Sequence, residues 1–268
     1  MWNHIPWLGI GQRWDSPKDT QRFIDHADLL SYVEPSLPLP LQALPPSVPV
    51  LAHSSEIPLA TSSSINPRLL EQLQSQVRQL NSPWAGEHFC FNSSIETGEL
   101  GYNFAPILDE TTLADTIRNI EEVKDAYGCL LAIEEGPRYH SWNGKWDDLA
   151  FMLEAAQATD SAIILGIGHH YCTVKNLGKD ATAGLTQTVL DRIVEVHITG
   201  IGEHRTPGFF HDNHAASVSE DCWKLLEWTL PQTPNLKAVT LEHNHIVSKQ
   251  EYALDLARLV ELVDQMRT

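Results

Sequence analysis

The sequence predicts an α/β fold, a single TIM-like (β/α)8 barrel that extends over residues 1–268. Eight short apolar segments of strand length occur along the chain, and most are followed by a segment with the pattern of a helix. The apolar segments are nearly continuous rather than alternating, which is typical of parallel strands buried on both faces. The chain also has the length of such a barrel, and no internal repeat or break in composition indicates a second domain.

The expected strands are apolar runs that end in glycine or in polar residues. They cover residues 7–11, 30–34, 48–53, 84–89, 129–135, 162–167, 194–200 and 236–242. Helical patterns predict helices over residues 17–27, 66–80, 110–127, 146–159, 184–191, 219–228 and 248–266. Asn66 or Ser64 and Asp109 supply N-caps, and Gly128 ends the third of these helices. Six prolines in residues 35–49 exclude a regular helix there and predict an extended surface loop.

The charge composition argues against a nucleic-acid-binding protein. The chain has 35 acidic and 18 basic residues and a formal net charge of −17, whereas proteins that bind nucleic acids usually present basic surfaces. The four cysteines are scattered, which argues against a zinc knuckle, an iron–sulfur cluster or a disulfide framework. The N-terminal residues lack the pattern of a secretory signal, and the apolar runs are too short to span a bilayer. We therefore expect a cytoplasmic protein with no membrane partner.

Histidines and acids gather at the C-terminal ends of the expected strands. In the strand over residues 194–200, alternation places Glu195, His197 and Thr199 on one face, and an Asp-x-His sequence follows in the next loop. A closed barrel brings such strand ends together at one mouth, where enzymes of this fold keep their catalytic residues. Six consecutive strands end in, or are closely followed by, residues of this kind: His53; Glu87 and His88; Glu134 and Glu135; His169 and His170; His197, Asp212 and His214; Glu242, His243 and His245.

This concentration of carboxylates at the mouth predicts a metal site. Several uncompensated carboxylates in a dry cavity would repel one another strongly, and divalent cations remove that repulsion. Mixed imidazole and carboxylate ligands suit iron, zinc or manganese. Glu134 and Glu242 lie at strand ends where a carboxylate can bridge two metals, so we expect two or more ions.

Several segments at and after the expected strand ends form a set of motifs. They are Glu87-His88-Phe89, Leu130-Leu131-Ala132-Ile133-Glu134, Val196-His197-Ile198-Thr199-Gly200, Asp212-Asn213-His214 and Leu241-Glu242. These motifs resemble those of the multinuclear non-heme iron-dependent oxidase (MNIO) family, long described as a domain of unknown function. The similarity extends from Gly9 to the last helix, and the order and spacing of the motifs together are fairly specific.

The resemblance implies a TIM-like barrel that holds two or three iron ions. Characterised members of the family use dioxygen to modify residues, often cysteines, of ribosomally synthesised peptides. A separate partner protein usually presents the precursor peptide. His197, Asp212 and Glu242 are the residues that we expect to be catalytic. By position, the resemblance implies the metal ligands His53, His88, Glu134, His197, Asp212, His214 and Glu242.

Three departures from the family pattern concern the same mouth. The family usually has Asp-x-Asn-Asn after the sixth strand, whereas this chain has Gly166-Ile167-Gly168-His169, with the histidine at the position of the second Asn. Gly200-Ile201 replaces a Gly-His pair, and Glu242-His243-Asn244 replaces Glu-Trp-Asp. Either His169 substitutes as a metal ligand, or the protein is a divergent member with fewer metals.

Other functions on the same barrel stay open at this point. The ligand order is also similar to that of the trinuclear zinc barrels of endonuclease IV type, in which a histidine follows a strand-six Asp by three residues. Here His169 is present, but Gly166 replaces the Asp. Zinc or manganese are therefore alternatives to iron. A sugar isomerase or epimerase of related form and a degenerate barrel that binds a peptide without turnover are further alternatives. In the oxidase interpretation, residues 35–49 and Phe209-Phe210 are expected to line a peptide groove.

Overall fold

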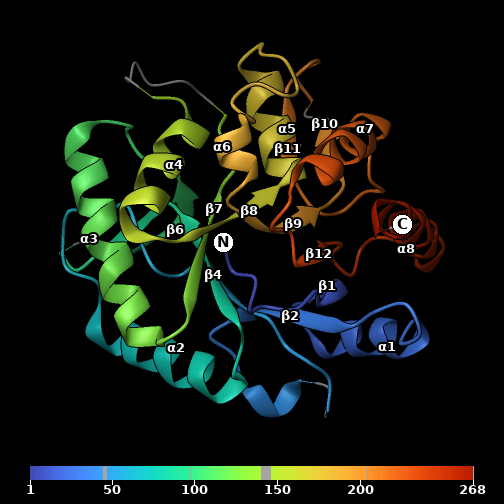
Figure 1. Ribbon diagram of the computed structural model, residues 1–268, viewed down its shortest axis with the longest axis horizontal. Helices are drawn as coiled ribbons and strands as arrows, with labels where there is room; N and C mark the ends of the chain where they lie inside the picture. The colour runs from blue at the N-terminus through green and yellow to red at the C-terminus, as the bar shows by residue number, and fades with distance from the viewer. Residues whose placement is uncertain (45–46, 97, 140–145, 204, 268) are drawn as a thin grey trace.

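The chain folds into a closed barrel of parallel strands (Figure 1). The computed structural model describes residues 1–44, 47–96, 98–139, 146–203 and 205–267. In these residues eight strands pair in the order β1, β12, β9, β8, β7, β4, β3 and β2, and β1 pairs with both β12 and β2. The predicted fold class is therefore confirmed. The strands are β1 (Gly9–Trp14), β2 (Tyr32–Leu37), β3 (Ala52–Ser54), β4 (Trp84–Phe89), β7 (Leu130–Glu135), β8 (Ala162–Gly166), β9 (Ile193–Ile198) and β12 (Ala238–Leu241).

Helices surround the barrel and connect its strands (Figure 1). They are α1 (Pro17–Asp25), α2 (Pro67–Leu80), α3 (Glu110–Tyr127), α4 (Asp148–Thr159), α5 (Ile167–Asn176), α6 (Gln187–Leu190), α7 (Glu220–Thr229) and α8 (Lys249–Arg267), with the short 3-10 helices η1 (Leu41–Ala43) and η2 (Leu230–Gln232). The side chains of Asn66 and Asp109 cap α2 and α3 as predicted, and Gly128 ends α3 with a φ of 74°. Among the described helices, none combines the length and apolar character that a bilayer span requires.

The structure differs from the predicted elements in two connections of the barrel. β2 continues beyond Glu34, since the fixed φ of Pro35 suits an extended strand and the strand loses only one N–H donor there. Helix α5 begins at Ile167, directly after β8, where the sequence predicts no helix. Gly166 and Gly168 weaken the helical signal there, because glycine disfavours a helix by about 1 kcal/mol relative to alanine.

Two antiparallel hairpins that were expected to be loops extend from the C-terminal end of the barrel. They are β5 (Phe91–Ser94) with β6 (Gly98–Phe104), and β10 (Ile201–Glu203) with β11 (Phe210–Asp212). β6 is exposed at nearly every position, so it lacks the alternation of apolar and polar residues that indicates a strand. The second hairpin holds Asp212 opposite Ile201, just beyond the end of β9.

Apolar side chains close the N-terminal end of the barrel. Inside the ring of strands, Tyr32, Trp84, Ile164 and Val194 form a buried cluster together with Ile5 of the N-terminal segment. Figure 1 accordingly shows the N-terminus at the centre of the ring. A larger apolar cluster lies between the strands and the helices. The polar strand ends therefore lie at the opposite end of the barrel.

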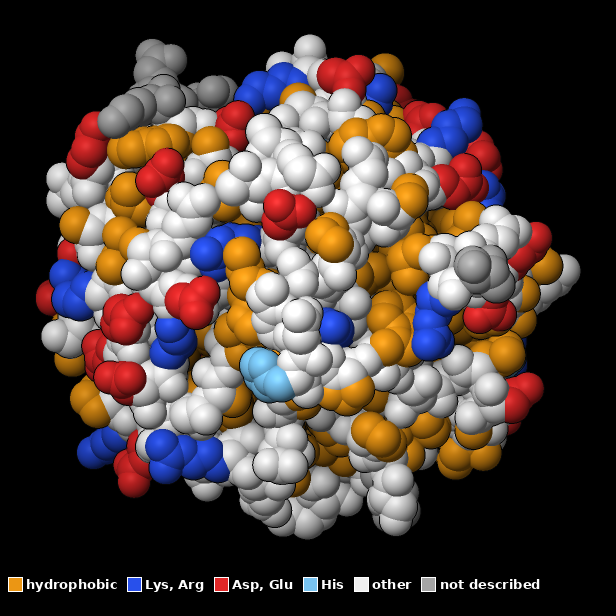
Figure 2. All heavy atoms as spheres, in the orientation of Figure 1, with side chains coloured by type: hydrophobic (Ala, Val, Ile, Leu, Met, Phe, Trp, Pro, Cys, Tyr) orange, Lys and Arg blue, Asp and Glu red, His pale blue; other side chains and the backbone are white. Residues whose placement is uncertain are grey.

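Most of the charge that is visible on the outside lies over the helices. On the face shown in Figure 2, Lys and Arg side chains are interspersed with Asp and Glu, and histidine scarcely appears. The histidines and acids at the strand ends are instead buried, since His53, Glu134, His197 and Glu242 each expose 5% of their surface or less. These residues are therefore not ordinary surface charges.

Candidate metal centre at the mouth of the barrel

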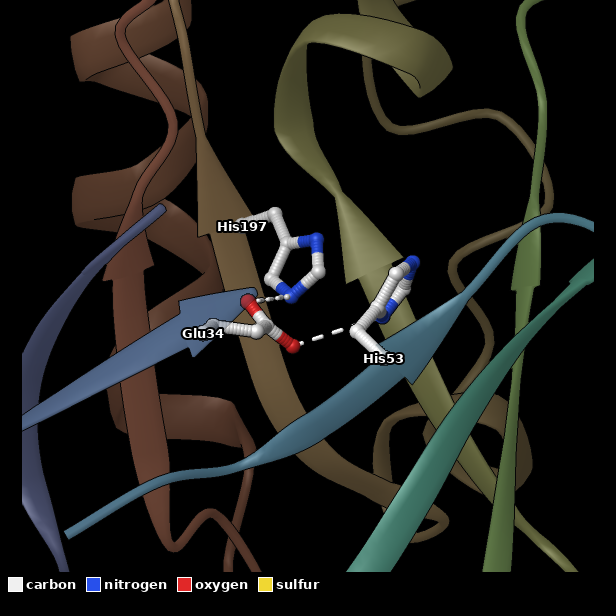
Figure 3. A group of neighbouring side chains, drawn as sticks. All are labelled: Glu34, His53 and His197. Atoms are coloured by element: carbon white, nitrogen blue, oxygen red, sulfur yellow. Dashed lines mark ion pairs between the residues drawn. The ribbon is translucent and has the colours of Figure 1, made fainter. Parts of the chain in front are cut away.

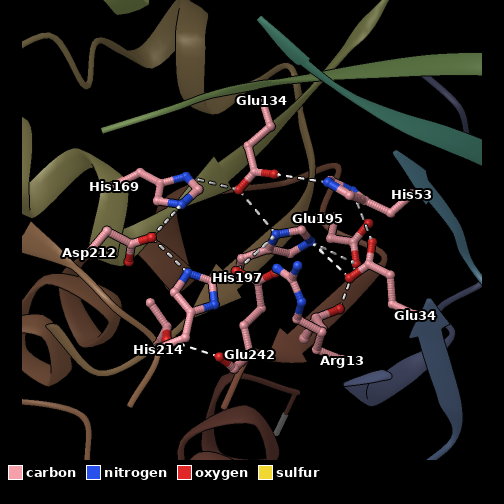
Figure 4. A network of polar contacts seen from close by, with 12 residues as sticks. Arg13, Glu34, His53, Glu134, His169, Glu195, His197, Asp212, His214 and Glu242 are labelled. Carbon is pink, nitrogen blue, oxygen red and sulfur yellow. Dashed lines mark hydrogen bonds and ion pairs between the residues drawn. The ribbon is translucent and has the colours of Figure 1, made fainter. Parts of the chain in front are cut away.

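Glu134, near the end of β7, contacts four histidines of a polar cluster at the mouth, and Figure 4 shows it beside His53, His169 and His197. Its side chain is 1% exposed. Oε2 lies 3.4 Å from Nε2 of His53 and 3.2 Å from Nε2 of His88. Oε1 lies 3.3 Å from Nδ1 of His169 and 3.1 Å from Nδ1 of His197. The four rings come from β3, β4, α5 and β9, so the closure of the barrel brings together residues that are distant in sequence.

Glu242 joins the cluster from the position directly after β12. Its Oε2 atom lies 3.4 Å from Nδ1 of His197. Its Oε1 atom accepts a hydrogen bond of 3.1 Å from Nη1 of Arg13, which also donates to Asp15 and Ser36. Arg13 thus fixes one oxygen of Glu242 and leaves the other facing the ring of His197.

Asp212 and two histidines form a further, less deeply buried part of the cluster. Oδ2 of Asp212 lies 3.3 Å from Nε2 of His169 and 2.8 Å from Nε2 of His214. Nδ1 of His169 lies 2.8 Å from the backbone oxygen of Glu135, which can only accept a hydrogen bond. In the neutral ring of His169 the proton therefore lies on Nδ1. This is the tautomer that binds a metal through Nε2.

Gly166 makes room for the ring of His169. A Cβ atom placed at position 166 would lie 2.7 Å from Nδ1 of His169 and 2.9 Å from Oε1 of Glu134. Both distances are shorter than normal contacts, so the ring occupies the space into which a side chain at position 166 would point. Gly166 and His169 both depart from the family pattern, and the ring of His169 fits only because position 166 has no side chain. This is the arrangement expected if His169 takes the place of the missing Asp.

The residues of the cluster form groups that suit metal ions. Several of their buried atoms have no hydrogen-bond partner, including Nε2 of His53, Oε2 of Glu134 and Oδ1 of Asp212. Unpaired polar atoms and clustered carboxylates are costly in a buried site, and divalent cations compensate both. All eight residues predicted as ligands lie in these groups, although their roles as ligands stay predictions. The ligand atoms lie within 4.8 Å of one another in three groups: His53, His88 and Glu134; Glu134, His197 and Glu242; His169, Asp212 and His214.

The other strand-end residues face away from this centre. Glu87 accepts a hydrogen bond from Tyr127 of α3. His170 contacts a backbone oxygen in the segment after α5, and His243 pairs with Asp255 of α8. Each of the three immediately precedes or follows a member of the cluster. Alternation along β4 turns Glu87 away from His88, and the helical turn of about 100° per residue in α5 separates His170 from His169.

Two acids that were not predicted as ligands also contact His197. Nε2 of His197 lies 3.1 Å from Oε2 of Glu34 and 3.5 Å from Oε1 of Glu195. The carboxylate of Glu195 already accepts hydrogen bonds from Trp84 and Thr240. Glu34 is the last residue of an expected strand. The criterion that identified the other residues, an acid or histidine at a strand end, therefore applied to Glu34 as well.

Opposite charges dominate the electrostatics of the cluster. Burial alone raises the pKa values of Glu134 and Glu242, but neighbouring imidazoles, with His197 first, hold both well below the usual range. Burial alone lowers the pKa of His197, but Glu134 and then Glu34 raise it well above 6.5. His88 differs, because burial prevails and lowers its pKa to about 3. Without metal, protons on histidines therefore balance the carboxylates.

We expect the metal-free protein to lose stability as the pH rises above about 6.5, and bound metal to remove that loss. His169 and His197 have folded-state pKa values above the unfolded value of 6.5. Their contribution is fully present below pH 6.5 and is lost as the pH rises through the raised values. Glu134 and Glu242 have lowered pKa values, so their contribution is present above about pH 4.5 and is lost only in stronger acid. Bound cations need neutral imidazoles and take over the balance of charge.

Thermal unfolding of chelator-treated and metal-loaded protein between about pH 6 and pH 9 measures this difference. Each kcal/mol lost should lower the Tm by roughly 2–4 °C for a protein of this size. A metal-free Tm that rises across this interval would contradict the expectation. So would two Tm profiles with the same slope.

A cleft of about 830 Å³ opens above the cluster. Its floor includes His88, His169, Asp212 and His214, and much of its wall comes from the β5–β6 hairpin. The segments that were expected to line a groove, residues 35–49 and Phe209-Phe210, are not among the described residues that border this cleft. The volume lies within the range of small-molecule sites, so one side chain of a substrate and its neighbours fit.

Known proteins resemble this chain over most of its length. The sequence pattern of the family described as "RiPP precursor modification enzyme MbnB/TglH/ChrH" matches residues 23–263. A "UPF0276 protein" of Neisseria meningitidis serogroup C is 26% identical over 200 residues, which cover 74% of this chain and 70% of the relative. A "UPF0276 protein" of Bordetella pertussis is 25% identical over 226 residues, which cover 82% of this chain and 77% of the relative.

Solved structures with the same fold include enzymes of other kinds. Endonuclease IV from Thermus thermophilus superposes with a TM-score of 0.61 at 13% identity, over 96% of this chain and 99% of that chain. D-psicose 3-epimerase from Clostridium cellulolyticum superposes with a TM-score of 0.56 at 12% identity, over 97% and 98%. At these identities the likeness shows the fold alone.

Proposed function

Because the chain belongs to the family of RiPP precursor modification enzymes MbnB/TglH/ChrH, as its MNIO motifs indicated, we propose that it oxidises a residue of a ribosomally synthesised precursor peptide. We propose cysteine as that residue, iron as the metal and dioxygen as the oxidant. The observation that carries the proposal is the set of three ligand groups, two of which share Glu134, with members of two groups at the floor of the cleft.

The proposed ions would be held by the eight residues of the three groups. Imidazole and carboxylate ligands suit iron, as they suit zinc and manganese. When bound, iron would supply the redox chemistry with dioxygen, which protein side chains do not perform by themselves. His53, His88 and Glu134 would hold one ion, Glu134, His197 and Glu242 a second, and His169, Asp212 and His214 a third.

Neighbouring side chains orient the ligands and limit the access of water. Arg13 fixes one oxygen of Glu242 and so directs the other at the centre. The hydroxyl of Tyr139 accepts a hydrogen bond from the backbone N–H of Asp212. Burial raises the pKa of the Tyr139 phenol, which therefore stays protonated and can donate a hydrogen bond to a substrate in the cleft. Apolar packing around Trp84 closes the barrel from the opposite end.

The lining of the cleft favours a peptide over a nucleic acid. Among the described residues that line it, Arg13 is the one Lys or Arg side chain, and it is already paired with Glu242. Asp15, Glu56 and Glu99 add negative charge to the same lining. A phosphate backbone needs basic partners and would be repelled here. We therefore propose a precursor peptide as the substrate, presented by a separate partner protein.

A turnover assay tests the proposal. We expect iron-loaded protein to consume dioxygen and to change the mass of a cysteine-containing precursor peptide encoded beside its gene, with the partner protein present. Zinc-loaded protein should do neither, because zinc is not redox-active. An oxygen electrode and mass spectrometry give the two readouts, and a peptide with serine in place of cysteine is the control.

The opposite result would support a different enzyme on the same barrel. If zinc-loaded protein cleaved abasic DNA and iron-loaded protein left every peptide unchanged, the oxidase proposal would be wrong. Loss of the iron-dependent mass change without DNA cleavage would instead favour a barrel that binds a peptide without turnover.

A further inference from the structure

Glu34 lies between two histidines that belong to different ligand groups. It is 2% exposed on β2, and its two carboxylate oxygens face different rings (Figure 3). Oε1 lies 3.3 Å from Nδ1 of His53, and Oε2 lies 3.1 Å from Nε2 of His197. One carboxylate therefore contacts two ligand groups. His53 belongs to the group with His88 and Glu134, and His197 belongs to the group with Glu134 and Glu242.

The opposite nitrogen of each ring faces Glu134. Nε2 of His53 lies 3.4 Å from one oxygen of Glu134, and Nδ1 of His197 lies 3.1 Å from the other. A neutral imidazole has one N–H donor and one lone pair. With metal held by the groups that contain Glu134, each ring would turn its lone pair towards Glu134, and its N–H would then face the carboxylate of Glu34.

We propose that Glu34 is a positioning residue that sets the tautomer and orientation of both His53 and His197, and so prepares two neighbouring metal positions together. The proposal rests on the proposed metal centre, because it takes both histidines as ligands. Carboxylates that accept the second ring proton of a ligating histidine strengthen metal binding in this way.

Two neighbouring features support this role for Glu34. Both of its oxygens are buried without a hydrogen-bond partner, and the rings of His53 and His197 are their ion-pair partners among the described residues. Glu195, which also lies near His197, is instead engaged by Trp84 and Thr240. Among the described residues, the ion pairs of Glu34 are thus those with the two proposed ligands.

A direct role for Glu34 as a ligand is the competing arrangement. Glu34, His53 and His197 also offer ligand atoms within 4.8 Å of one another. A cation held there would use the nitrogens that face Glu34, so both rings would have to bind metal on both sides and lose both ring protons. The positioning role needs no such deprotonation.

Metal titration of Glu34→Gln distinguishes the two arrangements, with Co²⁺ as the probe and its absorption spectrum as the signature. We expect two bound equivalents to weaken by roughly 10- to 100-fold, with the stoichiometry at saturation unchanged and altered Co²⁺ bands. Glu34→Asp, which keeps the carboxylate on a shorter stem, should recover part of the affinity. Glu87→Gln is the matched control, because Glu87 is equally buried on β4 but faces Tyr127.

Two results would overturn the proposal. Loss of one whole equivalent with the other affinities unchanged would make Glu34 a direct ligand, and unchanged affinity and spectrum would remove any role for it at the centre. If Glu34→Gln fails to fold, Glu34→Asp carries the same measurement. Because the titration needs no peptide turnover, its outcome is independent of the oxidase assay.

Discussion

Replacing Glu134 with glutamine is expected to remove two of the three proposed metal equivalents and to lower peptide oxidation by roughly 100- to 1,000-fold. Oε2 of Glu134 faces His53 and His88, whereas Oε1 faces His169 and His197. A glutamine side chain keeps one oxygen and replaces the other with an amide nitrogen that does not ligate. The remaining oxygen can serve only one of the two ligand groups, and both groups lose the negative charge that they share.

Glu135→Gln is the matched control for this experiment. Glu135 is the next residue on β7 and is almost as buried as Glu134. Burial raises the pKa of its carboxyl well above the usual range, which favours the neutral form that glutamine resembles. Metal content by mass spectrometry and turnover of the peptide are the two measurements. A Glu134→Gln variant with full metal content and activity would show that Glu134 is not the bridging ligand.

The barrel was predictable because its strands are continuous apolar runs that stop at polar residues. The run from Leu130 to Ile133 stops at Glu134 and Glu135, and this pattern places a strand end without any knowledge of its neighbours. Parallel strands in a closed barrel share one C-terminal end, so the residues at these stops had to meet. The apolar run alone does not show which of the two adjacent acids faces inwards, and the resemblance to the family pattern selected Glu134. The pairing of His88 with Glu134 across β4 and β7 sets which acid faces inwards.

The contacts across the barrel could not be predicted from the residues at the strand ends. Glu34 on β2 reaches His197 on β9, and these strands are separated in the barrel by β1 and β12. No pattern along the chain encodes such a distance, because it depends on the tilt of the strands and the packing inside the ring. The ring of His169 is a similar case. Its position follows from a helix that starts directly after Gly166, and glycines conceal that start.

Replacing His169 with alanine is expected to remove the third proposed metal equivalent and to leave the other two bound. Nε2 of His169 lies 3.3 Å from Oδ2 of Asp212, and this group shares no residue with the other two. His170→Ala is the matched control, because His170 is the next buried residue of α5 and its ring contacts the backbone oxygen of Ala181 instead. Metal content of both variants, measured on folded protein, separates the two outcomes. Equal metal loss in both variants would point to a general effect on α5.

The close contact between His169 and position 166 provides a second test of the role of His169 as a metal ligand. Gly166→Asp alone should destabilise the protein by about 1–3 kcal/mol, because its Cβ would lie 2.7 Å from Nδ1 of His169. The His169→Ala background removes this closest contact and leaves Oε1 of Glu134 at 2.9 Å, so the same aspartate should destabilise the protein less. Its carboxylate should then restore the third metal equivalent in place of the ring. Unfolding midpoints and metal content of the single and double variants measure this exchange. A stable Gly166→Asp single variant with three bound metals would mean that the ring of His169 does not occupy the space of the missing acid.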